Sequence, residues 1–225
     1  TEKGLQNLPG TIDHLMKYNP SYISCTYGAG GGNVGANREV CQMIKNAGTT
    51  PVTHFTVIKN TKEGIKEQLD QYLADGVDHM LALRGDIPLG ETTTCGDFDY
   101  ATDLVKFVRD TYGDKFEIAV AGSPEGHISC RSLESDIAVL KQKQDNGADY
   151  IMTQLCWDME QFRYWLDAIR KAGITMPVDV GVMPILDQAA TINMALSRNG
   201  CVMDRELSRM ISRHLSLIHI SEPTR

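Results

Sequence analysis

The run Leu81-Ala82-Leu83-Arg84-Gly85-Asp86-Ile87-Pro88 passes from apolar residues to two opposite charges around one glycine. The apolar part predicts a strand. The glycine lets the backbone turn there or approach a ligand closely, and the proline delays the next helix. In α/β proteins, ligands bind where strands end in this way. Taken alone, the turn is better explained as a strand end with a solvated ion pair, so its meaning depends on how the other strands of the chain end.

Strand-like and helix-like segments alternate along the chain. Apolar, β-rich runs occupy residues 22–26, 52–57, 79–83, 117–121, 150–154 and 178–182. Helical spacing of apolar residues predicts helices over residues 5–18, 38–47, 62–74, 100–112, 132–146, 159–172 and 187–196. This order predicts βα units with a parallel sheet. Because a (β/α)8 barrel has eight strands and about 250 residues, we expect an α/β fold, a (β/α)8 TIM barrel that is incomplete and lacks its first and eighth strands.

The composition restricts the class of protein. With 225 residues, 42% of them hydrophobic, the chain can form one soluble domain with a sizeable core. The sequence contains no run of 18 apolar residues, so we expect neither a membrane-spanning segment nor a signal peptide. A net charge of −7 offers no basic surface for nucleic acid or an anionic membrane. The cysteines contain no Cys-x-x-Cys pair, so we expect reduced thiols in a cytoplasmic protein, without a metal site.

Residues 215–225 break the strand and helix pattern. They match the translation of a transposase adapter used in sequencing libraries, and we expect them not to be native. The expected domain organisation is a partial barrel over residues 1–214 followed by an adapter-derived tail over residues 215–225. Genomic reads that continue unbroken through this peptide would contradict the interpretation.

Polar residues recur at the predicted strand ends. Thr26 closes the first run, His54 lies within the second, and Gln154 closes the fifth. The third and fourth runs end in Arg84-Gly85-Asp86 and in Ser123-Pro124-Glu125-Gly126-His127. Each alone is explained by turn chemistry or, for His54, by a hydrogen-bonded core residue. Together they predict one site on one rim of the barrel.

The residue types on this rim favour holding a cofactor over direct nucleophilic catalysis. The sequence has no Gly-x-Ser-x-Gly, His-Glu-x-x-His or P-loop motif. Gly30-x-Gly32-x-x-Gly35 formally fits the dinucleotide fingerprint, but no acid lies between Glu39 and Glu63, where that fingerprint needs one. We therefore interpret the glycines as a flexible loop. A rim rich in hydrogen-bond donors suits a cofactor that carries the chemistry itself.

The strand-end motifs also occur in a definite order. They are Thr26-Tyr27-Gly28-Ala29, His54, Leu83-Arg84-Gly85-Asp86-x-Pro88, Ser123-Pro124-Glu125-x-His127, Thr153-Gln154 and Gly181-x-Met183-Pro184-Ile185. Over residues 1–214 the chain resembles 5,10-methylenetetrahydrofolate reductases of the bacterial type. The resemblance implies a flavin-binding TIM barrel in which NAD(P)H reduces FAD. FAD then passes hydride to 5,10-methylenetetrahydrofolate to give 5-methyltetrahydrofolate, in one-carbon metabolism and methionine biosynthesis.

The resemblance assigns roles to matching positions. The FAD contacts it implies are Tyr27, Ala29, His54, Arg84, Gly85, Asp86, Ala101, His127, Asp136 and Lys143. The substrate contacts are Thr26, Asp86 and Gln154, and Asp86 and Gln154 are the expected catalytic residues. The Asp86 anion would favour the iminium cation that forms when the folate ring opens.

The chain departs from the family pattern at several points. The family often has Tyr where this chain has Ser123. Its acid is a Glu on the first strand, before Thr1-Glu2-Lys3, and we do not assign that role to Glu2. Its folate-contacting Arg lies on the eighth strand. We therefore expect this chain by itself to be inactive and to bind FAD poorly.

Other interpretations stay open. The chain can also be another pterin- or flavin-binding TIM barrel, such as a pterin-dependent methyltransferase, or a non-catalytic barrel remnant. The donor can be NADH, NADPH or a ferredoxin-linked system. The expected partners are the small-molecule substrate and further copies of the chain, with an electron-transfer subunit as a further option; nucleic acid and membrane are not expected.

Overall fold

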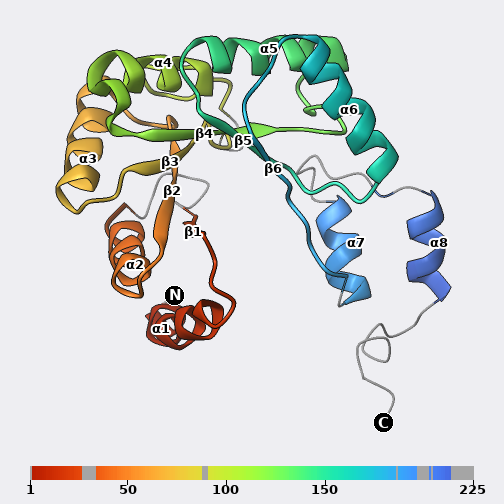
Figure 1. Ribbon diagram of the computed structural model, residues 1–225, viewed down its shortest axis with the longest axis horizontal. Coiled ribbons are helices and arrows are strands. Elements are labelled where there is room, and N and C mark those ends of the chain that lie inside the picture. Colours follow the sequence, from red (N-terminus) through yellow and green to blue (C-terminus); the bar gives the residue numbers. More distant parts are fainter. Residues whose placement is uncertain are drawn as a thin grey trace. The chain divides into compact units, whose positions relative to one another are not determined.

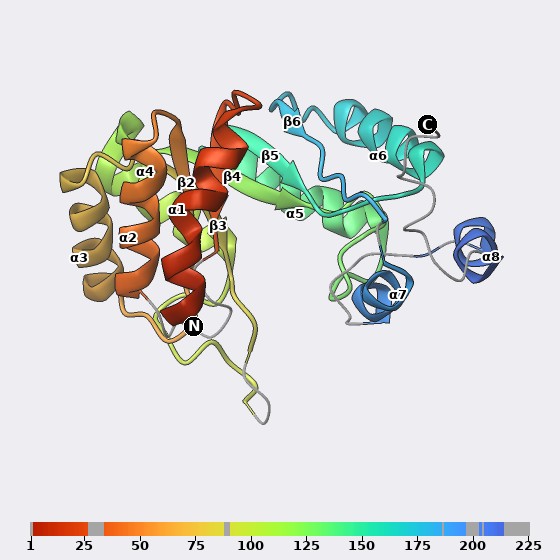
Figure 2. The same ribbon diagram turned by 90° about the horizontal axis from the view of Figure 1, so that it is seen from below.

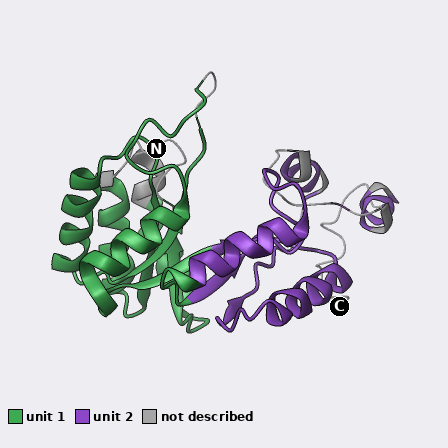
Figure 3. Ribbon diagram, turned by 90° about the horizontal axis from the view of Figure 1, so that it is seen from above, with its two compact units in different colours: residues 1–120, 145–149 green, residues 121–144, 150–225 purple. Residues whose placement is uncertain are grey.

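The computed structural model describes residues 2–26, 34–87, 91–185, 187–196, 203 and 205–213. The chain forms two compact units (Figure 3). The first unit comprises residues 1–120 and 145–149, and the second comprises residues 121–144 and 150–225.

Parallel strands run through the first unit (Figure 1). β1 (Tyr22–Cys25) pairs with β2 (Thr50–Thr56), which pairs with β3 (His79–Leu83), which pairs with β4 (Glu117–Gly122). The register places Cys25 beside Thr53 and Thr56 beside Leu83. The carboxyl ends of β1, β2 and β3 therefore lie at the same edge of the sheet.

Helices pack against these strands. α1 (Glu2–Met16), α2 (Val34–Asn46) and α3 (Lys62–Ala74) lie side by side (Figure 2). α4 (Ala101–Tyr112) contacts β3 and continues into a short 3-10 helix (Gly113–Lys115). The helices bury their apolar faces on the sheet, which is the favourable arrangement for amphipathic helices beside a parallel sheet.

The side chains of β2 alternate between two environments. Phe55 is fully buried and its ring contacts Tyr72 of α3, while the Thr53 hydroxyl donates to Asn37 of α2 at 2.8 Å. Thr53 and Phe55 therefore face the helices. Since successive strand residues point to opposite faces, His54 and Thr56 face away from the helices.

The second unit repeats the same βα arrangement. β5 (Tyr150–Thr153) pairs in parallel with β6 (Val178–Asp179). Its helices are α5 (Leu133–Asp145), α6 (Met159–Lys171), α7 (Gln188–Leu196) and α8 (Arg205–Arg213). At the end of β4, a Cβ on Gly122 would lie 2.6 Å from the Ile151 Cγ2 atom, so only glycine fits there.

The strand order follows the chain order, β1-β2-β3-β4-β5-β6, and a helix comes after each strand. Parallel neighbours that are joined by helices in this order have the topology of a (β/α)8 barrel. The described residues carry six strands. The predicted α/β fold, an incomplete (β/α)8 TIM barrel, is confirmed.

The structure corrects some predicted limits. The strand predicted over residues 178–182 ends at Asp179, because Val180 and Val182 are 43% and 81% exposed and gain little from extending it. The first helix begins at Glu2 rather than at residue 5, and the second begins at Val34 rather than at residue 38. α8 was not predicted, and residues 215–225 lie outside the described residues.

Among the described residues, none of the cysteines forms a disulfide; these are Cys25, Cys41, Cys95, Cys130 and Cys156. Of the helices in the described ranges, none is long and apolar enough to cross a membrane.

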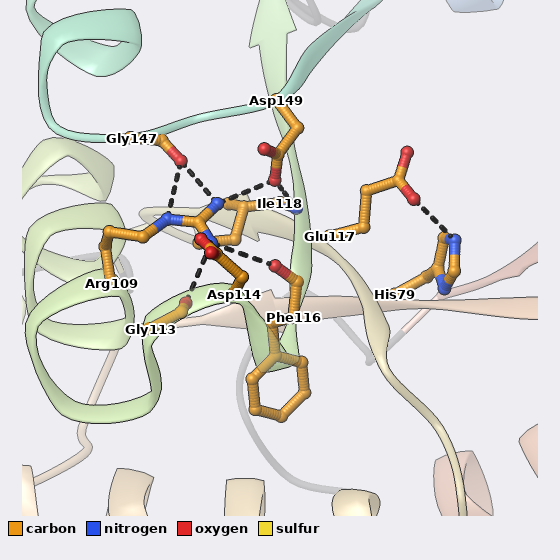
Figure 4. A network of polar contacts seen from close by, with 9 residues as sticks. All are labelled: His79, Arg109, Gly113, Asp114, Phe116, Glu117, Ile118, Gly147 and Asp149. Carbon is orange, nitrogen blue, oxygen red and sulfur yellow. Dashed lines mark hydrogen bonds and ion pairs between the residues drawn. The ribbon is translucent and has the colours of Figure 1, made fainter.

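A polar network joins the elements at the amino end of β4 (Figure 4). The Arg109 guanidinium of α4 donates to the carbonyl oxygens of Gly147 and Gly113 and to the Asp149 carboxylate, with the shortest contact at 2.6 Å. Asp149 in turn accepts the Ile118 backbone N–H at 2.7 Å. In barrels of this kind the amino ends of the strands serve stability, so we interpret this network as structural.

Candidate functional site

The first unit brings predicted site residues to the carboxyl ends of three neighbouring strands. Thr26 directly follows β1, His54 lies near the end of β2, and Arg84-Gly85-Asp86 directly follow β3. Because Cys25 is paired with Thr53, Thr26 continues β1 at the level of His54. Ala101 is the first residue of α4 and is partly buried. The edge of the sheet thus carries a hydroxyl, an imidazole, a guanidinium and a carboxylate.

His54 is held in a desolvated position. Its Nε2 atom is buried and has no hydrogen-bond partner among the described residues. Burial lowers the pKa of His54, because removal from water disfavours the charged imidazolium. An unpaired buried nitrogen costs about 1–3 kcal/mol. Its Nε2 atom therefore differs from that of the hydrogen-bonded core histidine that the sequence favoured for His54 taken alone.

Gly85 shapes the turn after β3. It has a φ of +86°, and a Cβ there would lie 3.0 Å from Ile58 Cγ2 and 3.1 Å from Thr56 Cβ. Glycine is needed both for the turn and for its close approach to the end of β2.

The two charges of this turn do not neutralise each other. Arg84 is partly exposed and its Nε donates to the Gly85 carbonyl at 3.4 Å, while Asp86 is exposed. The described turn contains no Arg84–Asp86 ion pair, so the solvated ion pair considered from the sequence is not what the structure shows. Both charges are available to a ligand.

In the second unit, Asp136 of α5 is fixed near the end of β4. Its carboxylate accepts hydrogen bonds from the His127 backbone N–H at 3.2 Å and from the Cys130 thiol at 3.5 Å. Burial, followed by the nearby Asp136 charge, raises the pKa of Cys130, so this thiol stays protonated and can donate. The arrangement joins His127 and Asp136, which the resemblance assigned to one cofactor.

Lys143 lies on the same helix, α5. Its Nζ donates to the carbonyl oxygen of Ala121, the penultimate residue of β4, at 3.0 Å. Desolvation lowers the pKa of Lys143, and the Asp136 carboxylate partly opposes that shift. An ammonium group that lacks water gains from an anionic ligand, since such a ligand restores the stabilisation of its charge.

Gln154 follows β5 directly. Its backbone N–H donates to the Gly122 carbonyl at 2.7 Å, and its side-chain Oε1 accepts the Leu155 N–H at 2.9 Å. These bonds hold the residue at the carboxyl end of β5, where the sequence predicted it.

Two residues that the sequence reasoning missed have the same signature as His54. The Thr56 Oγ1 and Trp157 Nε1 atoms are buried, and neither has a hydrogen-bond partner in the part of the chain that the structure describes. The spacing of Thr56 from His54 on one strand face could have indicated it. Nothing in the sequence singles out Trp157. Tyr27 and Ala29 lie outside the described residues.

The residues present fit a flavin cofactor. In the first unit, the buried His54 Nε2 has no partner among the described residues and suits a hydrogen-bonding ring. In the second unit, the desolvated Lys143 ammonium suits a phosphate. In the described ranges, no group of His, Cys, Asp or Glu side chains could hold a metal ion.

The fold is that of an incomplete (β/α)8-barrel protein with polar residues at the carboxyl ends of its strands, the end at which barrels of this class bind their ligands. The family model described as methylenetetrahydrofolate reductase matches residues 1–210. The chain therefore belongs to the methylenetetrahydrofolate reductase family.

Curated relatives agree with this assignment. Methylenetetrahydrofolate reductase (NADH) 1 of Arabidopsis thaliana is 36% identical over 208 residues, which cover 87% of this chain and 35% of the relative. The 5,10-methylenetetrahydrofolate reductase of Escherichia coli is 33% identical over 181 residues, covering 80% of this chain and 60% of the relative. The chain thus spans about a third of the plant relative's length.

Solved structures share the fold. An uncharacterised protein from Clostridium thermocellum that binds two copies of 5-methyl-5,6,7,8-tetrahydrofolic acid has a TM-score of 0.68 and 13% identity, covering 98% of this chain and 73% of that one. A 2,3-dimethylmalate lyase of the PEP mutase/isocitrate lyase superfamily has a TM-score of 0.54 and 12% identity, covering 91% and 84%. At these identities the likeness concerns the fold alone.

Proposed function

We propose that the full-length protein containing this chain reduces 5,10-methylenetetrahydrofolate to 5-methyltetrahydrofolate, with NAD(P)H as donor and FAD as bound cofactor. The observation that carries the proposal is the family match over residues 1–210, with charged and polar residues where β1 to β5 end. FAD, when bound, supplies hydride transfer between the nicotinamide and the folate.

The first unit contributes neutral and positive contacts to the flavin. His54 offers its unpaired Nε2, and Arg84 offers the guanidinium donors that suit ribityl or phosphate oxygens. Gly85 presents backbone without a side chain. Ala101, the first residue of α4, stays assigned to the cofactor by resemblance. Tyr27 and Ala29 stay assigned to the cofactor by resemblance.

The resemblance also assigns to the cofactor three residues that lie in the second unit, namely His127, Asp136 and Lys143. The Lys143 ammonium has one acceptor among the described residues, the Ala121 carbonyl, and therefore retains donors for an anion. A pyrophosphate beside the Lys143 ammonium would raise the lowered pKa of this group, because a nearby negative charge stabilises the protonated form. Asp136, held by two donors, keeps its carboxylate oriented for hydroxyl groups of the ligand.

Asp86, Thr26 and Gln154 act on the substrate. The exposed Asp86 carboxylate stabilises positive charge on the folate as its ring opens, which lowers the barrier to reduction. The Thr26 hydroxyl and the Gln154 carboxamide orient the pterin and the nicotinamide. The resemblance assigns the acid of the reaction to a Glu on the first strand of the family barrel, and we do not give that role to Glu2.

The proposal also covers the electron donor, the assembly of the protein and the limits of its catalytic barrel. The donor is NADH, NADPH or a ferredoxin-linked partner subunit, and the protein works as a homo-oligomer in the cytoplasm. Residues 1–214 are part of the catalytic barrel, and residues 215–225 are adapter-derived; the family model matches residues 1–210.

A spectrum and a turnover assay test the function. The purified full-length protein should be yellow, release FAD on heating, oxidise NADH or NADPH with menadione as acceptor, and form 5-methyltetrahydrofolate. A colourless protein that transfers the methyl group of 5-methyltetrahydrofolate to an acceptor would instead establish the methyltransferase alternative.

A further inference from the structure

The strand β2 carries two buried threonines, and only one of their hydroxyl groups has a hydrogen-bond partner among the described residues. Thr53 is fully buried and donates to the Asn37 side-chain oxygen at 2.8 Å, on the helix side of the sheet. Thr56 is 3% exposed, and within the described ranges its Oγ1 atom has no hydrogen-bond partner. The same residue type is thus fully satisfied on one face of the strand and unsatisfied on the other.

Thr56 lies among residues that the proposed function uses. It shares a strand face with His54, two residues earlier, whose Nε2 is also unpaired. The turn after β3 packs directly against it, since a Cβ on Gly85 would lie 3.1 Å from the Thr56 Cβ. The turn that carries Arg84 and Asp86 therefore packs against the Thr56 side chain at its Cβ atom.

Burial of a hydroxyl without a partner destabilises a folded chain, and most buried polar groups avoid it. Two such atoms on one strand face, at the end where ligands bind in this fold, indicate that a ligand supplies the missing partners. We propose that Thr56 is a further cofactor-binding residue, whose hydroxyl donates to an acceptor of the flavin ring beside His54. The inference rests on the proposed function and extends it by one contact.

The proposal predicts effects of opposite sign for one substitution. Thr56→Val removes the hydroxyl at nearly constant volume, so the flavin-free protein loses an unsatisfied group and its Tm should rise by about 2 °C. The same variant loses a contact to the cofactor, so the Kd for FAD should increase about three- to tenfold. A residue with a purely structural role would not raise the Tm and weaken FAD binding together.

Thr53→Val on the same strand is the matched control. It removes a hydroxyl that has a partner, so the Tm of the flavin-free protein should fall by about 2 °C while FAD affinity stays within about twofold. Thr56→Ser, which retains the hydroxyl, should keep FAD affinity near that of the wild type. The measurements are thermal unfolding of flavin-free full-length protein and FAD titration by flavin fluorescence.

The outcomes separate this proposal from the one on which it rests. A wild-type protein that binds no FAD overturns the proposed function together with this contact. A wild-type protein that binds FAD, with a Thr56→Val variant of equal affinity, overturns the Thr56 contact alone. Unchanged stability of flavin-free Thr56→Val also overturns it, because the hydroxyl is then satisfied by water.

Discussion

Arg109 of α4 donates two hydrogen bonds to the carbonyl oxygen of Gly147, from Nε at 3.0 Å and from Nη2 at 2.6 Å (Figure 4). The remaining donors reach the Gly113 carbonyl and the Asp149 carboxylate. One side chain thus joins the end of α4 to the segment that precedes β5. Because the planar guanidinium offers five donors in a fixed geometry, no other side chain can replace it.

Substitution of Arg109 should therefore lower stability strongly. Arg109→Met keeps the aliphatic packing but leaves the Gly147 and Gly113 carbonyl oxygens without this donor, at a cost of about 2–4 kcal/mol. The urea midpoint of the full-length protein measures the loss. Lys106→Met on the same helix removes only the exposed pair with Asp110 and should cost less than about 0.5 kcal/mol. Equal midpoints for the two variants would contradict the structural role of Arg109.

Asn37 should be equally sensitive, because it satisfies several buried groups at once. Its Oδ1 accepts the Thr53 hydroxyl at 2.8 Å and the Tyr72 hydroxyl at 2.7 Å, and its Nδ2 donates to the Cys25 carbonyl. Asn37→Ala should cost about 3–5 kcal/mol by thermal or urea unfolding, since it leaves these groups unpaired and opens a cavity.

A second substitution tests that explanation of the Asn37 effect. Tyr72→Phe should cost less in the Asn37→Ala background than in the wild type, because the hydroxyl has already lost its acceptor. Asn46→Ala, at the exposed end of α2, is the control and should change stability by less than about 0.5 kcal/mol. Strictly additive effects of the Asn37 and Tyr72 substitutions would argue against a shared network.

The buried His54 predicts how the stability of the flavin-free protein depends on pH. Its folded-state pKa is lowered by desolvation, so the unfolded chain binds more protons in the range just below the ordinary value of about 6.5. His54 therefore reduces stability as the pH falls through that range and has no such effect above it. His54→Gln should make the Tm fall less steeply between pH 7.5 and 5, because the unfolded variant no longer takes up the proton that binds to His54 (about one proton per chain). Parallel Tm curves for the two proteins would show that His54 is not desolvated.

Asp86 should matter for the folate half of the reaction only. Asp86→Asn keeps the shape of the turn but removes the anion, so folate reduction should fall about a hundredfold while FAD affinity and NAD(P)H–menadione activity stay within about threefold. Asp99→Asn, an exposed residue before α4, should leave both half-reactions unchanged. Stopped-flow measurement of each half-reaction separates them, and undiminished folate reduction would remove Asp86 from the mechanism.

Local patterns were sufficient for the order of the elements. Apolar runs and the helical spacing of apolar residues predicted six strands and most helices, because both patterns depend on residues a few positions apart. The end of β6 could not be predicted in this way. Val180 and Val182 favour a strand by type, yet they are exposed, and exposure depends on what the rest of the chain places beside them.

The candidate site shows the same difference between local sequence patterns and tertiary structure. The sequence by itself determined which residue types stand at the ends of the strands, since Thr26, His54, Arg84, Asp86 and Gln154 follow or end apolar runs that any reader of the chain can find. Only the tertiary structure decided which of their polar atoms are paired. Thr53 has a partner and Thr56 has none, because the Asn37 acceptor comes from α2 on the opposite face of β2. Hydrogen-bond partners of this kind lie far apart in the sequence, and folding alone brings them within reach.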